Sequence, residues 1–326
     1  MKKRKKYVPK LSPDLPELFV AKLKELFSEA DFQLIMSGFS KNRKTSLRIN
    51  TLKTDPEKIR TELETLGISY EESPLSDLAL VLPESTSREV TELRMYQEQE
   101  IYLQNLSSML PPLVLAPEPG EKILDMTAAP GSKTTQMAAM MAKQGQLVAF
   151  ELNFVRFKRL EANVAQQVGD DFVEVRHEPG ENAGFKFANH FDKVLLDAPC
   201  SSEGQFSLTN PKSYAYWNRH KVKEMVYKQS KLINAAFHAL KPGGLLLYST
   251  CTFAPEENEQ IVDKILKKHP EELEILDIEL PFQPDNLRPG FTSYNNRNFH
   301  PDLARTIRVL PDQQFEGFYL ALLRKK

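Results

Sequence analysis

The sequence predicts an α/β fold: a seven-stranded, mostly parallel sheet with an antiparallel edge, preceded by a small α+β module. Two observations predict it. From Gly120 onward, apolar segments of strand length alternate with amphipathic segments of helical spacing, and this alternation specifies a parallel sheet covered by helices on both faces. Before Gly120, the helical and extended segments are mixed and end at a pair of prolines. A chain of 326 residues can bury one large core and a smaller one.

The strands and helices of the larger sheet follow in order along the chain. Its predicted strands are 122–126, 146–151, 172–176, 193–197 and 244–249, and its predicted helices are 133–142, 154–167 and 221–240. The sequence Lys241-Pro242-Gly243-Gly244 ends the last helix. The apolar segments 273–278, 306–310 and 317–323 are expected to complete the sheet with its antiparallel edge. Ligands of such sheets bind at the carboxyl ends of the strands.

The N-terminal part predicts a helical and α+β module. Helical apolar spacing over 14–39 indicates one or two helices, and 46–50 and 78–82 are predicted strands with a helix over 55–66 between them. A further helical stretch over 87–110 is expected to end at Pro111-Pro112. We therefore expect two domains, residues 1–112 and residues 113–326.

Composition limits the function classes. The net charge is -1. A run of basic residues stands in Met1-Lys2-Lys3-Arg4-Lys5-Lys6, and this run is either a solubilising tail or an arm that contacts phosphates. No apolar run approaches the ~20 residues that span a bilayer, so a cytoplasmic protein without a membrane partner is expected. Two cysteines and six scattered histidines predict neither a disulfide scaffold nor a metal site.

The loop after the first strand is a candidate ligand site. Thr127-Ala128-Ala129-Pro130-Gly131-Ser132-Lys133 leads from the strand into a helix. Its small residues allow a close backbone approach, and amides at the helix start favour a carboxylate or phosphate. A tight turn is the alternative explanation. The loop lacks the glycine patterns of dinucleotide and nucleoside triphosphate sites.

Glu151 ends the second strand, where an acidic residue accepts hydrogen bonds from a ribose diol. A surface glutamate is the alternative. Together with the first loop, this position suggests a ligand that carries both adenosine and an amino-acid-like carboxylate. S-adenosylmethionine fits that description.

Two cysteines follow neighbouring predicted strands. Asp197-Ala198-Pro199-Cys200 ends the fourth strand and Ser249-Thr250-Cys251-Thr252 ends the fifth, so Asp197, Cys200 and Cys251 are expected at one rim of the sheet. This set suits an inert ring: a thiolate adds to C6 of cytosine, C5 becomes nucleophilic, and an acid near N3 stabilises the developing charge. The alternatives are buried structural cysteines and a redox pair, although the spacing of a thioredoxin-like motif is absent.

These motifs resemble those of the Nol/Nop/Sun family of RNA cytosine-5 methyltransferases, especially its bacterial 16S ribosomal RNA branch, over nearly the whole chain. The sequence from Ser46 to Lys53 is similar to the family's N-terminal RNA-binding signature, and the sequence from Tyr102 to Pro111 is similar to its entry into the catalytic domain. The resemblance implies a class I methyltransferase, Rossmann-like fold. Its implied catalytic residues are Cys251 as the nucleophile, Cys200 for product release and Asp197 beside the cytosine.

The resemblance also implies the remaining site residues. The expected cofactor-binding residues for S-adenosylmethionine are Thr127, Ala128, Ala129, Pro130, Gly131, Ser132, Lys133, Glu151, Arg156, Glu178 and Asp197. The expected substrate-binding residues are Arg48, Asn50 and Pro199.

The sequence departs from the family pattern in places. Pro179 stands where the family presents an aspartate to the adenine, and either Glu178 or a backbone group is expected to substitute. Gln205 to Pro211 replaces a loop with a basic pair, and the chain ends at Lys326, before the C-terminal RNA-binding domain of longer relatives. The partner is expected to be RNA, with ribosomal RNA favoured over transfer RNA, and the protein is expected to be a monomer.

Rival interpretations remain. A methyltransferase of exocyclic amines or of protein would carry an Asp/Asn-Pro-Pro-aromatic motif where this chain has Asp197-Ala198-Pro199-Cys200. A catalytically inactive RNA-binding or ribosome-assembly factor would keep the fold without needing Cys200 and Cys251.

Overall fold

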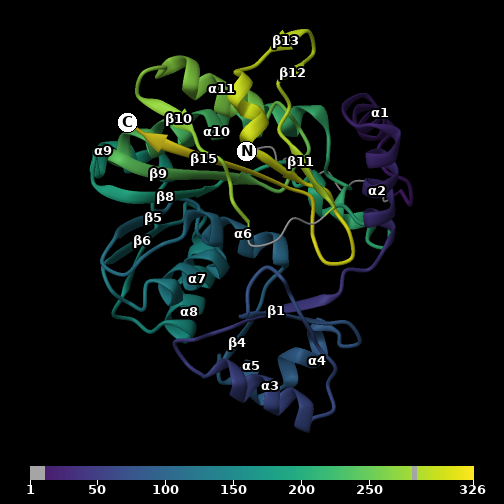
Figure 1. Cartoon of the computed structure of the whole chain (residues 1–326), viewed down its shortest axis with the longest axis vertical. Coiled ribbons are helices and arrows are strands. Elements are labelled where there is room, and N and C mark those ends of the chain that lie inside the picture. Colours follow the sequence, from purple (N-terminus) through teal and green to yellow (C-terminus); the bar gives the residue numbers. More distant parts are fainter. Residues whose placement is uncertain (1–11, 281–284) are drawn as a thin grey trace, which may run out of the picture.

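The computed structural model describes residues 12–280 and 285–326, so the basic segment 1–6 lies outside the described residues. A nine-stranded mixed sheet runs through the larger part of the protein (Figure 1). Its parallel strands, in spatial order, are β7 (Val173–Arg176), β6 (Gln146–Phe150), β5 (Lys122–Asp125), β8 (Phe191–Asp197) and β9 (Leu240–Thr250). The predicted parallel sheet is therefore confirmed.

The antiparallel edge is larger than the sequence predicted. β15 (Phe318–Lys325) pairs with β9, and it is followed by β14 (Ile307–Val309) and β11 (Leu287–Pro289), while β10 (Leu273–Ile275) pairs with the end of β15. The sheet has nine strands in the described residues, not the predicted seven; each of the eight apolar segments named from the sequence overlaps a strand, and β11 is the strand that was not predicted. β11 has no apolar alternation and contains a proline, which sheets tolerate at an edge, so its sequence carries no strand signal.

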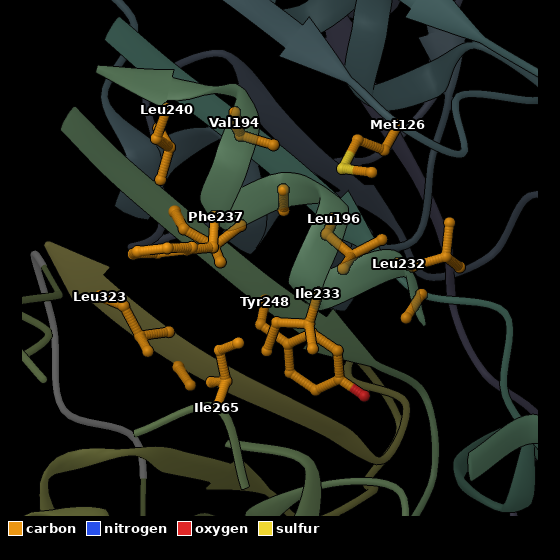
Figure 2. Close-up of a cluster of buried hydrophobic side chains, with 14 of the residues drawn as sticks. Met126, Val194, Leu196, Leu232, Ile233, Phe237, Leu240, Tyr248, Ile265 and Leu323 are labelled. Carbon is orange, nitrogen blue, oxygen red and sulfur yellow. The ribbon is translucent and has the colours of Figure 1, made fainter. Parts of the chain in front are cut away.

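Helices cover both faces of this sheet. One face carries α10 (Arg219–Ala239) and α11 (Glu259–Lys268), and the other carries α6 (Leu106–Leu115), α7 (Ser132–Met140) and α8 (Phe154–Gln167). Successive strand residues alternate between the two cores: Val194 and Leu196 pack with α10, and Leu195 packs with the opposite group. Figure 2 shows the first core, where Leu232, Ile233 and Phe237 of α10 meet Tyr248 and Leu323 of the sheet.

The N-terminal module is a four-stranded antiparallel sheet, which appears below the larger sheet in Figure 1. Its strand order is β2 (Glu71–Glu72), β3 (Ala79–Leu82), β1 (Thr45–Ile49) and β4 (Ile101–Leu103). Helix α3 (Pro56–Thr65) covers it and begins after Asp55, whose side chain accepts from the Glu57 N–H. The predicted strands and this helix are confirmed.

The expected continuous helix over 87–110 is wrong. The segment forms α4 (Ser87–Glu92), α5 (Arg94–Gln97), β4 and then α6, because β4 fills the free edge of β1. Helix α6 also continues through Pro111 and Pro112, where the domain boundary was expected. Pro112 has no N–H for the carbonyl of Ser108, and the Gln104 side chain donates to that oxygen instead, at 3.2 Å.

The first two helices pack on the larger part of the protein rather than on the N-terminal sheet. α1 (Glu17–Leu26) and α2 (Glu29–Ser40) share a buried cluster with the loops after β8 and β9, in which the rings of Phe19 and Phe206 lie 4.9 Å apart. Figure 1 shows α1 and α2 beside the larger sheet.

The remaining elements are short. They are α9 (Ala183–Lys186), η1 (Gly180–Asn182), η2 (Glu203–Gln205), η3 (Pro211–Ser213), η4 (Pro301–Arg305) and the hairpin of β12 (Ser293–Tyr294) and β13 (Arg297–Asn298). Within residues 12–280 and 285–326, no helix has the length and apolar character needed to cross a bilayer.

Candidate active site

The carboxyl ends of β5, β6, β8 and β9 border a cavity of about 880 Å³. The predicted site residues that line it are Thr127, Ala129, Glu151, Arg156, Asp197, Pro199, Cys200 and Cys251. A second cavity of about 330 Å³ shares Thr127, Ala129 and Asp197 with the first and is also lined by Ala128, Pro130, Ser132 and Lys133. Four strand ends that are far apart in sequence thus contribute to one rim, as the motif positions predicted.

The loop after β5 is held in a tight turn. The Gly131 N–H donates to the carbonyl of Ala128 at 2.8 Å, and Gly131 has φ +109°, a left-handed conformation that disfavours residues with a Cβ. The guanidinium of Arg156 donates to the carbonyl of Ala129 at 2.6 Å, and the Asn163 side chain donates to that of Pro130 at 2.7 Å. Helix α8 therefore fixes the loop from outside, which gives Arg156 a positional basis for its predicted supporting role.

Glu151 is 5% exposed and faces the cavity after β6. One carboxylate oxygen accepts the N–H of Asn153 at 2.8 Å, and the other lies 3.5 Å from Arg156. An anchored carboxylate with remaining lone pairs can accept further hydrogen bonds from a ligand. The geometry is consistent with the predicted ribose contact.

Asp197 and Lys133 form an ion pair where the two cavities meet. Lys133 Nζ lies 2.7 Å from Asp197 Oδ2 and donates to Ser108 Oγ at 2.7 Å, while Ser249 Oγ donates to Asp197 Oδ1 at 2.8 Å. Burial by itself would lower the pKa of Lys133, but the negative charges of Asp197 and then Asp125 hold that pKa above its usual range. Lys133 therefore stays charged.

Asp125 lies at the end of β5 and is 1% exposed. Thr134 Oγ1 donates to its Oδ2 at 2.7 Å, yet burial raises the pKa of Asp125 to about 7. The sequence interpretation gave this residue no role. The signal was present, because Asp125 is the last residue of β5 and Glu151 directly follows β6.

The two cysteine side chains meet at the rim. Cys200 Sγ and Cys251 Sγ lie 3.2 Å apart, and Ser202 Oγ lies 3.7 Å from Cys251 Sγ. The hydrogen bond with Cys251, together with burial, holds the pKa of Cys200 well above its usual range. Cys200 therefore keeps its proton in this arrangement.

Glu178 is placed away from the cavity. Its carboxylate pairs with Lys186 and lies 3.8 Å from Arg176, whereas His177, Gly180 and Glu181 line the cavity. Glu178 was expected to contact the adenine in place of the family's aspartate. The structure does not support this contact, because the Glu178 carboxylate faces Lys186 and Arg176 and does not line the cavity. Glu181 has the exposed position at the cavity instead.

Arg48 and Asn50 lie in the interface between the N-terminal module and the larger part of the protein. Arg48 is 3% exposed and donates to Gln104 Oε1 and Thr135 Oγ1, each at 3.0 Å. Asn50 is 2% exposed and donates to the backbone and side-chain oxygens of Gln167 at 2.9 Å. Both side chains are buried where they join the N-terminal module to the larger part of the protein. Contact of either residue with RNA stays a prediction.

Helix α10 contributes cavity residues that the sequence interpretation missed. Lys221, Met225, Lys228 and Leu232 line the cavity, and their spacing places them on one face of the helix. The same spacing is typical of any helix that packs on a core, so the pattern could not distinguish a lining face from a buried one.

The residues that line the two cavities fit the chemistry of S-adenosylmethionine. Met126, Leu152 and Phe154 provide apolar surface, and Glu151 provides a buried acceptor beside it. The start of α7 with Lys133 provides positive charge for a carboxylate. In the described ranges, no group of three or more His, Cys, Asp or Glu side chains is placed to hold a metal ion.

Comparisons with known families agree with these observations. The family described as 16S rRNA methyltransferase RsmB/F matches residues 112–324, and the ferredoxin-like domain of RsmF/B-like methyltransferases matches residues 15–89. A crystal structure of a methyltransferase homologue from Pyrococcus horikoshii superposes with a TM-score of 0.82 at 28% identity, covering 96% of both chains. The predicted fold family is therefore confirmed.

Relatives with assigned names cover most of the chain. The tRNA (cytosine(49)-C(5))-methyltransferase of Pyrococcus abyssi is 38% identical over 93% of this chain and 96% of its own length. The ribosomal RNA small subunit methyltransferase F of Erwinia tasmaniensis is 33% identical over 95% of this chain, which spans 63% of that longer protein. The human 28S rRNA (cytosine(4447)-C(5))-methyltransferase is 33% identical over 99% of this chain and 40% of its own. The chain belongs to the RsmB/F family of S-adenosylmethionine-dependent methyltransferases.

Proposed function

We propose that this protein is an RNA cytosine-5 methyltransferase that acts on structured RNA through a covalent bond between Cys251 and C6 of the target base. The observation that carries the proposal is the pair of thiols, 3.2 Å apart, at the rim of a cavity that also contains Asp197. The names of the relatives support the same reaction independently. S-adenosylmethionine supplies the methyl group when it is bound.

The side chains have distinct tasks in this reaction. The thiolate of Cys251 adds to C6, which shifts an electron pair to C5 and makes that carbon the nucleophile. Asp197, hydrogen bonded by Ser249, is positioned to contact the ring, and the charged Lys133 paired with it offsets the negative charge that develops near N3. After methylation, C5 loses its proton, the C5–C6 double bond returns, and Cys251 leaves as a thiolate.

Cys200 is proposed to remove that proton. Its pKa is raised chiefly by the hydrogen bond with Cys251. Once Cys251 is bonded to C6 it carries no charge and no proton, so the largest cause of the raised pKa disappears and Cys200 loses its proton to solvent more readily, although burial still opposes that loss. The resulting thiolate accepts the C5 proton. The change of state of Cys251 thus prepares Cys200 for the second half of the reaction.

Cations at the cavity mouth suit a polyanionic substrate. Lys221 and Lys228 line the cavity, and Arg219 and Lys223 are exposed on the first turns of the same helix. Neither Arg219 nor Lys223 has an acidic partner within 4 Å in the described parts of the chain. Lys221 and Lys228 both pair with Glu224, so Arg219 and Lys223 are the cations of this helix that are available to phosphates near the target base.

Ribosomal RNA is the proposed target class, since several relatives act on ribosomal RNA by name. Transfer RNA is the second candidate, favoured by the Pyrococcus abyssi relative at 38% identity. We also propose a cytoplasmic monomer, for which light scattering of the purified protein is the test of oligomeric state.

The decisive experiment is bisulfite sequencing of total RNA from cells with and without the gene. A cytosine protected only when the gene is present identifies the target, and its position in ribosomal or transfer RNA decides between the two classes. Purified protein should then methylate the same transcript in vitro with S-adenosylmethionine. If no protected cytosine depends on the gene and no transcript is methylated, the proposed function is wrong.

A further inference from the structure

A buried carboxylate lies directly beneath the two cysteine loops. Glu257 is fully buried and follows Cys251 in the loop that leads to α11. Its Oε2 accepts the backbone N–H of Ser201 at 2.9 Å, and its Oε1 accepts the hydroxyls of Ser201 and Thr252. Ser201 is adjacent to Cys200 and Thr252 is adjacent to Cys251. One carboxylate therefore bonds to the neighbours of both cysteines.

Gln229 of α10 extends this contact set. Its side-chain amide donates to Glu257 Oε2 at 3.0 Å and to the carbonyl of Pro199 at 2.9 Å. Pro199 precedes Cys200, so the Cys200 loop is held on both sides of the cysteine. The hydroxyls of Ser201 and Thr252 also lie 2.8 Å apart, which joins the two loops directly.

We propose that Glu257 is a positioning residue that holds the Cys200 and Cys251 loops together, with Gln229 as its support, and thereby sets the distance between the two thiols. This inference rests on the proposed function for its catalytic consequence. Glu257 touches neither sulfur in the described contacts, so it positions the thiols through the residues beside them, although its charge also helps to raise the pKa of Cys200. Two catalytic residues on separate loops need a contact that holds the loops together, because small displacements of reacting groups lower the reaction rate strongly.

The burial of Glu257 argues against a purely incidental role. Burial, and after it the nearby charge of Glu203, raises the pKa of Glu257 to about 7, while Ser201 and Gln229 oppose that rise by donating hydrogen bonds. A buried carboxylate is unfavourable unless its partners satisfy it. Here the donors that satisfy it come from the cysteine loops and from α10.

The neighbouring glutamates provide matched controls. Glu259, two residues on, is also fully buried, but it pairs with Arg308, which in turn donates to the carbonyl of Phe253. Among the described residues, Glu259 thus reaches the Cys251 loop only through Arg308 and has no hydrogen bond to Ser201 or Thr252. Glu256, one residue before, is partly exposed and contacts Lys22 and Tyr294. Glu257→Gln, Glu259→Gln and Glu256→Gln therefore make the same chemical change at three positions within a stretch of four residues, each with different partners.

The first measurement is methyl transfer to the target RNA. Glu257→Gln should lower kcat by about 10- to 100-fold, because its amide cannot accept all of these donors, while KM for S-adenosylmethionine stays within about twofold. Thr252→Val, which keeps the shape and removes one donor, should give a smaller fall in kcat in the same direction. Glu256→Gln should keep kcat, and Glu259→Gln should lower thermal stability while the remaining folded protein keeps its kcat.

The second measurement needs no RNA. Diamide, a thiol oxidant, takes one hydrogen from each of two thiols that meet, and mass spectrometry counts the Cys200–Cys251 disulfide that results. Glu257→Gln should form it at least about threefold more slowly than wild type, because the loops no longer hold the sulfurs together. If wild type transfers no methyl group to RNA, the proposed function fails and this rate still decides the positioning role.

The positioning role is overturned by a folded Glu257→Gln protein with wild-type kcat and a wild-type rate of disulfide formation. It is also overturned if Glu259→Gln lowers kcat as much as Glu257→Gln at an equal loss of stability, because the effect would then be general destabilisation.

Discussion

Cys200 Sγ and Cys251 Sγ lie 3.2 Å apart although 51 positions separate the two residues in sequence. The parallel pairing of β8 with β9 brings their strand ends together, with Asp197 opposite Ser249 in the register. The thiols are therefore neighbours because of the sheet, and their loops need only short extensions beyond it.

The two cysteines should differ when each is replaced. Cys251→Ala should abolish turnover and form no covalent adduct, because it removes the attacking thiol, while S-adenosylmethionine still binds. Cys200→Ala should still attack and methylate but stall before release, which gives a slow protein–RNA band on a denaturing gel. The double variant should lack that band. An adduct with Cys251→Ala and none with Cys200→Ala would show that the roles are reversed.

Glu151→Ala should weaken binding of S-adenosylmethionine by about 1 to 3 kcal/mol, since ligand hydroxyls would lose a buried acceptor. Isothermal titration calorimetry measures the change. Glu161→Ala is the control, because Glu161 lies on α8 and pairs with Lys158 at the surface. Equal affinities for wild type and Glu151→Ala would remove Glu151 from the cofactor site.

Asp125 should make stability depend on pH. Its folded pKa of about 7 lies above its ordinary value of 3.8, so the folded state binds the proton more tightly and its contribution is lost as pH rises from about 4 through 7. Asp125→Asn should remove this contribution, so the free energy of unfolding of wild type relative to the variant should fall over that window, by up to about 4 kcal/mol. Urea unfolding at pH 5 and pH 8 should detect about 3 kcal/mol of this fall, because part of it occurs below pH 5. A constant difference between the two proteins would contradict a raised pKa.

Arg48→Ala should act on stability. The side chain is buried between the domains and makes hydrogen bonds to Gln104 and Thr135, so its loss should lower the free energy of unfolding by about 1 to 3 kcal/mol. The salt dependence of RNA binding should stay the same, because no phosphate contact is removed. A salt slope that falls by about one for Arg48→Ala would instead establish a direct RNA contact.

The basic segment 1–6 should contribute RNA affinity. Deleting it should weaken RNA binding more at low salt than at high salt, because counterion release accompanies phosphate contacts. Fluorescence anisotropy over a range of salt concentrations measures this, with Lys264→Glu on α11 as a charge-changing control away from the cavity lining. Unchanged affinity and slope would identify the segment as a solubilising tail.

Local signals determined most of the elements. Alternating apolar segments predicted the parallel strands because side chains on neighbouring positions face opposite cores, and the helices of the larger domain were predicted from their 3.6-residue spacing. Asp55 before α3 and the small residues of the loop after β5 are likewise signals that lie within a few residues of what they determine. The positions of Asp197, Cys200 and Cys251 at one rim followed from the same reasoning, because parallel strands end at a common edge.

Tertiary structure alone decided where polar residues without a local signal would lie. Arg48 and Asn50 resemble RNA-contacting residues in sequence, yet the packing of the N-terminal module against α7 and α8 buries them with Thr135 and Gln167. Glu257 is one of several glutamates in its loop, and only the meeting of two loops and α10 gives it Ser201, Thr252 and Gln229 as partners. Such contacts depend on how segments that are distant in the sequence pack together, so they cannot be predicted from the spacing of residues within one segment.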